Sequence, residues 1–268
     1  MWLLLAAGPA MAGEQVEIPS GDVKLRAMLY RPDGPGPFPA VVALHACDGL
    51  GEGLAHGEAP IEQRYQEWGE RLKAAGFAVL FPDSFGSRGL GSQCTARQRM
   101  VRASRTRIND ANAARHWLQV QPFIIGDRVS LLGWSHGATS TLWTVRRSAA
   151  LLRDKSHDFR SAVALYPNCQ RSGSLAWSAR IPTLILIGRN DDWTLAATCE
   201  AMVTNARGRS AGAQIVVYPH ARHDFDRANL HLTERRDIAN AANTRVHIAT
   251  DPAARADVFR RVPEWFAR

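Results

Sequence analysis

The sequence predicts an α/β fold, in which helices flank a doubly wound, mostly parallel β-sheet. Six apolar runs of about five or six residues, rich in β-branched side chains and without polar alternation, are typical of strands covered on both faces. Segments of helical periodicity separate these runs, and such alternation favours short right-handed crossovers. The 268 residues contain no internal repeat, so we expect one domain over residues 13–268.

The predicted elements follow one another in a regular order. Two strand-like runs open the domain, EQVEIP and VKLRAMLY, and a turn-rich segment, RPDGPGPFP, follows them. The strands of the parallel sheet are predicted at PAVVALHA, GFAVLFPD, RVSLLGW, SAVALYP, PTLILIG and AQIVVYP. Helices are predicted over residues 61–75, 97–120, 136–147, 195–205 and 252–267. Residues 227–250 are polar and irregular, and we expect them to form an excursion between the last strand and the closing helix.

Composition and charge exclude several classes of protein. Hydrophobic residues make up 46% of the chain and charged residues 22%, which excludes a disordered, collagen-like or disulfide-dense small protein. The formal net charge is +8, and all but three of the 33 basic residues are arginine. The arginines are scattered rather than gathered in a stripe with aromatic residues, so we expect no nucleic-acid partner. Apart from the apolar N-terminus, described below, no segment approaches the roughly 18 consecutive apolar residues of a membrane span, so we expect no membrane partner.

The first twelve residues resemble a shortened export signal. Residues 2–7 are apolar, and Ala-Met-Ala at positions 10–12 before Gly13 fits a small-residue cleavage site. The segment departs from a usual signal peptide in two ways: no lysine or arginine precedes the apolar run, and the run is short. A start codon placed too late would explain both departures. We therefore expect a truncated signal peptide over residues 1–12 and a periplasmic or secreted protein, the alternative being a cytoplasmic one.

Four cysteines bear on the same question. Cys47, Cys94, Cys169 and Cys199 lack the C-x-x-C spacing of zinc and redox sites. In an oxidising compartment we expect the bridges Cys47–Cys94 and Cys169–Cys199, because each pair would join loops at the same end of neighbouring strands. Four cysteines allow three connectivities, however, and the alternative is four reduced, buried thiols in a cytoplasmic protein.

A candidate nucleophile lies on a tight turn between a predicted strand and a predicted helix. Gly133-Trp134-Ser135-His136-Gly137 matches G-x-S-x-G, directly after RVSLLGW and directly before a helical segment. Such a turn strains the backbone of the serine and requires small flanking residues. It presents the serine hydroxyl above the carboxyl edge of the sheet, where ligands bind in open α/β sheets.

A serine hydroxyl needs a base, and the base needs an orienting carboxylate. The chain order for this turn is Ser, Asp, His, and suitable partners follow two strands downstream. Asp191 follows PTLILIG and His223 follows AQIVVYP. Asp192 and His220 compete with them. We favour Asp191, which lies three residues after Gly188 at the start of its loop, and His223.

Stabilising a tetrahedral oxyanion requires two preorganised N–H donors. In this turn the residue after the nucleophile supplies one of them, which is the backbone N–H of His136. The other should come from the loop after PAVVALHA, and we nominate the backbone N–H of Cys47.

Five further side chains are candidates for contact with a substrate. Phe85 and Arg88 follow GFAVLFPD, and Arg88 either binds a substrate carboxylate or braces its loop through a salt bridge. Trp134 and Trp193 flank the expected site and either form an apolar wall or pack in the core. His220, as the neighbour of the favoured base, either supports that base or contacts the substrate.

Taken together, the motifs resemble those of the dienelactone hydrolase family of α/β-hydrolases. The resemblance rests on HACDGLGEG, FPDSFGSRGL, GWSHGA, LIGRNDDWT and YPHARHDFD, in this order over most of residues 23–267. It implies Ser135 as nucleophile, Asp191 as acid and His223 as base. It also implies a compact enzyme without a large lid domain.

The sequence departs from this family's pattern at four positions. The founding members use a cysteine nucleophile where this chain has Ser135, which favours a general carboxylic ester hydrolase over an enzyme specific for dienelactones. Ala46 and His220 stand where glycine is common, and Leu195 stands where proline is common. Each of these three side chains would change the shape of the pocket.

We therefore expect a hydrolase of small-molecule carboxylic esters that works by two-step acyl transfer, without cofactor or metal, as a monomer or weak dimer. Lactone and polyester cleavage remain alternatives, as does a catalytically silent member of the fold that acts as a binding protein. Metal-assisted hydrolysis is disfavoured, because the close-lying His220, His223, Asp224 and Asp226 match no zinc signature.

Overall fold

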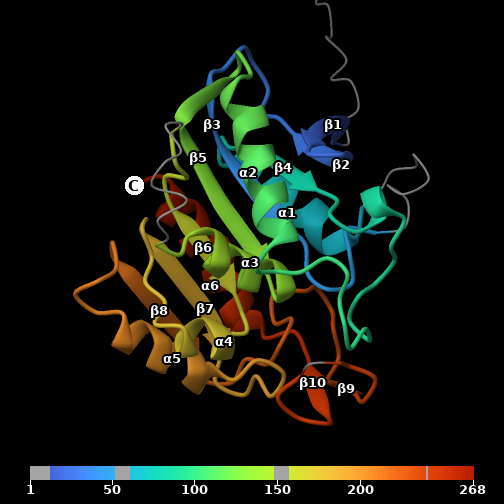
Figure 1. The fold of residues 1–268 in the computed structure, drawn as a ribbon, viewed down its shortest axis with the longest axis vertical. Coiled ribbons are helices and arrows are strands. Elements are labelled where there is room, and N and C mark those ends of the chain that lie inside the picture. Colours follow the sequence, from blue (N-terminus) through green and yellow to red (C-terminus); the bar gives the residue numbers. More distant parts are fainter. Residues whose placement is uncertain (1–12, 52–60, 148–156, 240) are drawn as a thin grey trace, which may run out of the picture.

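An eight-stranded sheet organises the chain, with strands in the order β1-β2-β4-β3-β5-β6-β7-β8 (Figure 1). The structure is a computed structural model that describes residues 13–51, 61–147, 157–239 and 241–268, so the expected signal peptide lies outside the described residues. β2 pairs antiparallel with β1 and with β4, and the other neighbours in the sheet are parallel. The predicted mostly parallel α/β sheet is confirmed.

Each strand predicted from an apolar run is present. The side chains of β4, β6 and β7 are buried along the whole strand, as expected where helices cover both faces of a sheet. The strands are β1 (Glu14–Ser20), β2 (Val23–Tyr30), β3 (Phe38–Leu44), β4 (Ala78–Pro82), β5 (Ile124–Trp134), β6 (Ala162–Leu165), β7 (Thr183–Gly188) and β8 (Ala213–Tyr218).

Helices lie on both faces of the sheet. Figure 1 shows α2 and α3 in front of it and α6 behind it. On the rear face α1 packs against α6, with the rings of Trp68 and Phe259 4.6 Å apart. Asp251 begins α6 by accepting a hydrogen bond from the N–H of Ala254. The helices are α1 (Gln63–Ala74), α2 (Thr106–Gln119), α3 (His136–Thr144), α4 (Gln170–Ser174), α5 (Ala196–Asn205) and α6 (Pro252–Phe266).

The structure differs from the predicted elements in three places. The helix predicted over residues 97–120 begins only at Thr106, because bends and turns occupy residues 97–105. Two short elements, η2 (Gly86–Arg88) and α4, were not predicted. The polar excursion contains a small antiparallel sheet, β9 (Thr233–Arg235) with β10 (Val246–Ile248). Val246 and Ile248 pack against Cys47, Cys94 and Trp193, a tertiary contact that three-residue strands do not reveal locally.

Both predicted disulfides are present. Cys47–Cys94 joins the loops that follow β3 and β4, and Cys169–Cys199 joins the start of α4 to α5. Two disulfides fit an oxidising compartment. Within the described ranges, none of the helices combines the length and the apolar character that crossing a bilayer requires.

Replacing Cys169 and Cys199 together by alanine is expected to lower the free energy of unfolding by about 2 to 4 kcal/mol. The bridge closes a loop between residues 30 positions apart, and its loss gives that entropy back to the unfolded chain. Urea unfolding of the oxidised wild type and of the double variant, at equal protein concentration, measures the difference. Coincident unfolding curves would contradict the expectation.

Candidate active site

Ser135 lies on a sharp turn between the end of β5 and the start of α3. Its φ of 49° and ψ of −110° are strained values for a residue with a side chain. The flanking glycines permit the turn. A Cβ on Gly137 would lie 1.9 Å from the Leu44 carbonyl oxygen, and one on Gly133 would lie 2.5 Å from the Gly137 carbonyl carbon. The G-x-S-x-G pattern therefore has a steric cause.

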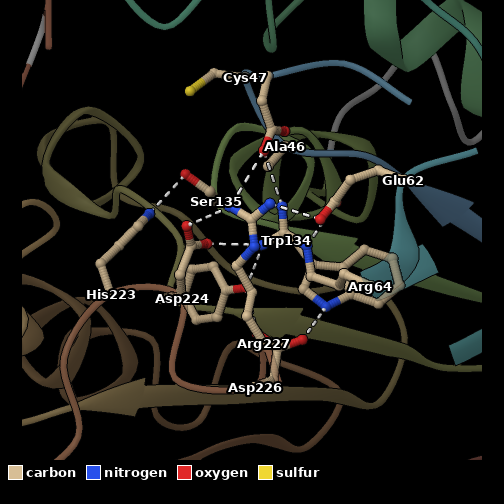
Figure 2. Close-up of polar contacts among 12 residues, drawn as sticks. Ala46, Cys47, Glu62, Arg64, Trp134, Ser135, His223, Asp224, Asp226 and Arg227 are labelled. Atoms are coloured by element: carbon tan, nitrogen blue, oxygen red, sulfur yellow. Dashed lines mark hydrogen bonds and ion pairs between the residues drawn. The ribbon is translucent and has the colours of Figure 1, made fainter. Parts of the chain in front are cut away.

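One chain of hydrogen bonds connects the three residues predicted as nucleophile, base and acid. His223 Nε2 lies 2.9 Å from Ser135 Oγ, a contact drawn in Figure 2, and His223 Nδ1 lies 2.8 Å from Asp191 Oδ2. The three side chains follow β5, β7 and β8, whose carboxyl ends meet at one edge of the sheet. None is more than 5% exposed, so the contacts lie where water weakens them little.

The loop after β7 holds the far side of the Asp191 carboxylate. Its Oδ1 accepts hydrogen bonds from the N–H of Trp193 at 3.0 Å and of Thr194 at 2.7 Å. Thr194 Oγ1 lies 2.9 Å from Asp191 Oδ2 and 3.2 Å from His223 Nδ1. The sequence analysis missed Thr194. The D-x-x-T spacing is the available signal, because aspartate readily bonds N–H groups two and three residues further on.

Asp191 raises the pKa of His223, and two aromatic rings hold its imidazole in place. Burial acts to lower the pKa of His223, but the charge and hydrogen bond of Asp191 outweigh it and raise that pKa above the ordinary 6.5. The Trp193 ring stacks on the imidazole with centroids 4.3 Å apart, and the Tyr166 ring packs against it at 4.6 Å. The backbone of His223 also bridges to Ile248 of β10. The imidazole is thus restrained on several sides.

The two competing residues lie outside this chain of hydrogen bonds. Asp192 Oδ2 lies 2.6 Å from His247 Nδ1, and its Oδ1 accepts a hydrogen bond from the His247 N–H at 2.8 Å. Asp192 therefore anchors β10. His220 is exposed to solvent. The geometry favours Asp191 and His223 over these neighbours, as the sequence reasoning does.

The two nominated oxyanion donors lie at the ends of neighbouring strands, β3 and β5. His136 is the first residue of α3, so its N–H has no partner within the helix. Cys47 lies in the loop after β3, where its sulfur is bonded to Cys94 and its carbonyl accepts a hydrogen bond from the Gln93 N–H at 2.7 Å. These two connections fix the loop that carries the Cys47 N–H.

Comparison with known proteins assigns the chain to a family. The model of the dienelactone hydrolase family matches residues 25–268. This chain belongs to the dienelactone hydrolase family. No curated protein matches it.

Solved structures of dienelactone hydrolase-like proteins share its α/β-hydrolase fold. A candidate dienelactone hydrolase from Klebsiella pneumoniae subsp. pneumoniae has a TM-score of 0.70 and 20% identity, covering 96% of this chain and 98% of that one. A dienelactone hydrolase-like promiscuous phosphotriesterase from metagenomic libraries has a TM-score of 0.70 and 19% identity, covering 95% and 97%. A dienelactone hydrolase from Anabaena variabilis has a TM-score of 0.65 and 19% identity, covering 96% and 98%.

In this member of the dienelactone hydrolase family, Arg88 is not free to bind a substrate carboxylate. Its Nη1 and Nη2 pair with the two carboxylate oxygens of Asp110 at 2.9 and 2.7 Å, and Nη1 also donates to the Ser84 carbonyl at 2.8 Å. The loop-bracing alternative is therefore correct, and the substrate-binding prediction is wrong. The physical reason is that Asp110 of α2, which is fully buried, needs a cationic partner.

The two tryptophans have different positions. Trp134 is fully buried, and its indole N–H donates to Asp226 at 2.9 Å beneath the site (Figure 2). The prediction that Trp134 contacts substrate is wrong, because its ring is directed into the core. Trp193 stacks on His223 and is therefore next to the reacting groups.

The last two candidates have different surroundings. Phe85 is 1% exposed and packs edge-on against His45 at 4.6 Å, so it supports the loop after β3 rather than offering a free surface. His220 is exposed, and its carbonyl accepts a hydrogen bond from the Asn190 side chain at 3.4 Å. Its imidazole lies in solvent, apart from the chain of hydrogen bonds that includes His223.

A polar cluster that the sequence analysis missed surrounds Arg64 (Figure 2). Its buried guanidinium donates to Asp224 at 2.7 Å, to Asp48 at 3.1 Å and to the Tyr166 hydroxyl at 3.1 Å. Burial alone would raise the pKa of Asp224, but Arg64 outweighs it and holds that pKa well below its usual range. Asp224 has a φ of 61°, so the ion pair also stabilises a strained backbone directly after His223.

The carboxylates of the disfavoured metal hypothesis are bonded to protein donors. Asp226 accepts hydrogen bonds from the indoles of Trp68 and Trp134 at 2.8 and 2.9 Å, and from the Tyr166 hydroxyl at 2.6 Å. Asp224 is held by Arg64. In the parts of the chain that the structure describes, no three side chains of ligand type gather as a metal site.

Proposed function

We propose that this protein is a serine hydrolase that cleaves carboxylic esters through an acyl-enzyme on Ser135. The observation that carries the proposal is the buried hydrogen-bonded chain from Ser135 Oγ through His223 to Asp191. A serine hydroxyl is a weak nucleophile alone, and this arrangement of base and orienting carboxylate is the one that activates it.

The proposed reaction has two steps of the same kind. His223 Nε2 takes the Ser135 proton as Oγ attacks the carbonyl carbon, and Asp191 stabilises the imidazolium that forms. The N–H groups of Cys47 and His136 bind the oxyanion. The imidazolium then protonates the leaving alcohol as the ester bond breaks. In the second step water attacks the acyl-enzyme, His223 takes its proton, and the released Ser135 oxygen is reprotonated as the acid departs.

Uncharged esters are the substrate class we propose to test first. The guanidinium predicted to bind a substrate carboxylate is paired with Asp110, which removes the specific argument for anionic esters. Open esters, lactones and polyesters all present the same reacting carbonyl. A panel of these three classes, graded in acyl length, would rank them by kcat/KM.

A burst and a covalent label together test the proposal. Rapid mixing with p-nitrophenyl acetate should release one equivalent of p-nitrophenol per active site before the steady state, as acyl-enzyme accumulation produces. Mass analysis after treatment with a fluorophosphonate should place the adduct on Ser135. Absence of both turnover and label would contradict the proposal and favour the silent binding protein.

We also propose that the protein functions in the periplasm or outside the cell. The two disulfides support this, because reducing compartments do not maintain structural bridges. Protein isolated without reductant and then denatured should react with no thiol reagent, and four reactive thiols would contradict the proposal.

The acid limb of the pH profile of kcat/KM is expected to lie above pH 6.5. The base must be neutral to accept a proton, and Asp191 raises the pKa of His223 above its ordinary value. Activity is therefore complete above the folded-state pKa of His223 and falls as the pH drops through it. Initial rates at low substrate concentration between pH 5 and 9, in buffers of constant ionic strength, measure the limb. An acid limb clearly below pH 6.5 would contradict the assignment.

A further inference from the structure

A buried arginine connects the two loops that carry the nominated oxyanion donors. Arg107 lies at the start of α2 and has no exposed surface. Its Nη1 donates one hydrogen bond to the His45 carbonyl at 2.6 Å, and it lies 3.2 Å from His136 Nδ1. His45 is two residues before Cys47, and His136 directly follows Ser135. This one guanidinium nitrogen, through its two hydrogens, thus connects the residues that follow β3 and β5.

The remaining nitrogens of Arg107 make this arrangement unusual. Nε and Nη2 are buried and have no hydrogen-bond partner within the described ranges. Within the same ranges no carboxylate lies within ion-pair distance of the guanidinium, and the more distant charges of Asp110 and Asp83 only partly offset the burial that lowers the pKa of Arg107. Asp110 pairs with Arg88, and the Asp83 Oδ1 accepts N–H groups of its own loop. Burying a cation with unsatisfied donors costs free energy. The two hydrogen bonds that Arg107 does make, to His45 and His136, therefore call for a functional explanation.

The bridge requires a neutral His136 and a charged Arg107, and the surroundings of both groups favour these states. His136 accepts through Nδ1, so its proton is on Nε2, and burial together with Arg107 lowers the pKa of His136 well below 6.5. The Phe85 ring lies 5.5 Å from the guanidinium and packs against His45. Burial lowers the pKa of Arg107 to about 10, so the group stays charged at neutral pH. A neutral acceptor and a cationic donor therefore face each other in a buried environment.

We propose that Arg107 is a positioning residue that sets the separation of the Cys47 and His136 N–H groups and places a buried positive charge behind the oxyanion. The inference rests on the proposed function, since it assumes that these two N–H groups bind the oxyanion. Displacement of either donor by a fraction of an ångström weakens the bond that forms only in the transition state. Arg107 itself need not touch the substrate.

Arg107→Met and Arg107→Lys test this role, with Arg115→Met and Arg115→Lys as matched controls. Arg115 lies on the same helix and is also buried, but it donates to the His157 carbonyl near the start of β6, at the opposite edge of the sheet. Active sites are counted by fluorophosphonate titration. The readouts are kcat and KM on p-nitrophenyl acetate and the inhibition constant of phenylboronic acid, which forms a tetrahedral adduct with serine.

In Arg107→Met we expect kcat per titrated site to fall about 10- to 100-fold, less than the roughly 100- to 1,000-fold that accompanies loss of a whole donor. KM should stay within about twofold, and the boronic acid should weaken by the same factor as kcat falls. Arg107→Lys keeps the charge but is too short to bridge both acceptors, so it should recover part of the loss. Both Arg115 variants should lose stability while kcat and boronate affinity remain within about twofold of the wild type.

Three results would overturn the inference. One is an Arg107→Met protein whose kcat per site and boronate affinity match the wild type, or, if that variant does not fold, a folded Arg107→Lys protein with unchanged values. Another is a loss confined to KM. The third is an equal loss in Arg115→Met, which would reduce Arg107 to a structural role. A wild type that neither turns over nor labels at Ser135 overturns the proposed function as well, so the two failures are distinguishable.

Discussion

Ser135→Ala is expected to lower kcat for p-nitrophenyl acetate roughly 10⁴- to 10⁶-fold and to abolish the burst. The variant removes the oxygen that lies 2.9 Å from His223 Nε2, so no acyl-enzyme can form at this position. Residual hydrolysis should come only from water attack assisted by the oxyanion donors and substrate binding. Stopped-flow and steady-state measurements on the same preparation give both values.

The fold should survive this change. The strained turn depends on Gly133 and Gly137, which the variant retains, and removal of a buried hydroxyl commonly leaves stability equal or higher at such sites. A melting temperature at or above that of the wild type is the control. A burst that persists in correctly folded Ser135→Ala would show that another nucleophile is used.

Asp191→Asn is expected to lower kcat about 10⁴-fold. Two N–H groups, of Trp193 and Thr194, bond to Asp191 Oδ1, so an asparagine would keep its carbonyl oxygen there and turn its NH2 group toward His223. His223 Nδ1 would then have to accept, which moves the ring proton to Nε2, where it blocks proton transfer from Ser135. The acid limb of kcat/KM should shift to lower pH, because the charge that raises the pKa of His223 is gone.

Asp192→Asn is the matched control for this substitution. It makes the same change one residue further along, at a side chain that contacts His247 and not the imidazole of His223. We expect kcat within about threefold of the wild type and an unchanged acid limb, because the substitution leaves the hydrogen bonds of Asp191 and His223 in place. The reverse order of effects would exchange the roles of the two aspartates.

The strands and the nucleophile turn could be predicted because their causes are local. A continuous apolar run such as TLILIG needs burial on both faces whatever surrounds it. The turn at Ser135 needs its glycines because neighbouring backbone leaves no room for a Cβ. Parallel strands also end at one edge, so the order of the runs along the chain brought Asp191 and His223 to the serine's side of the sheet.

The partners of arginines could not be predicted, because any of many carboxylates can satisfy a long cationic side chain. Arg88 pairs with Asp110 on another element, 22 residues away. Arg64 reaches Asp224 across 160 residues. For Arg107, the sequence shows neither its complete burial nor the two loops that it joins.

The sequence by itself determined the mostly parallel sheet, the strained turn at Ser135 and the edge where the loops that carry Asp191 and His223 meet, since apolar runs and glycines act through local sterics and burial. Only the tertiary structure decided which member of each competing pair joins the hydrogen-bonded chain to Ser135, which side chains are buried beneath that chain and which groups Arg107 bonds. These outcomes depend on packing between distant elements, where differences of about an ångström choose among chemically equivalent partners.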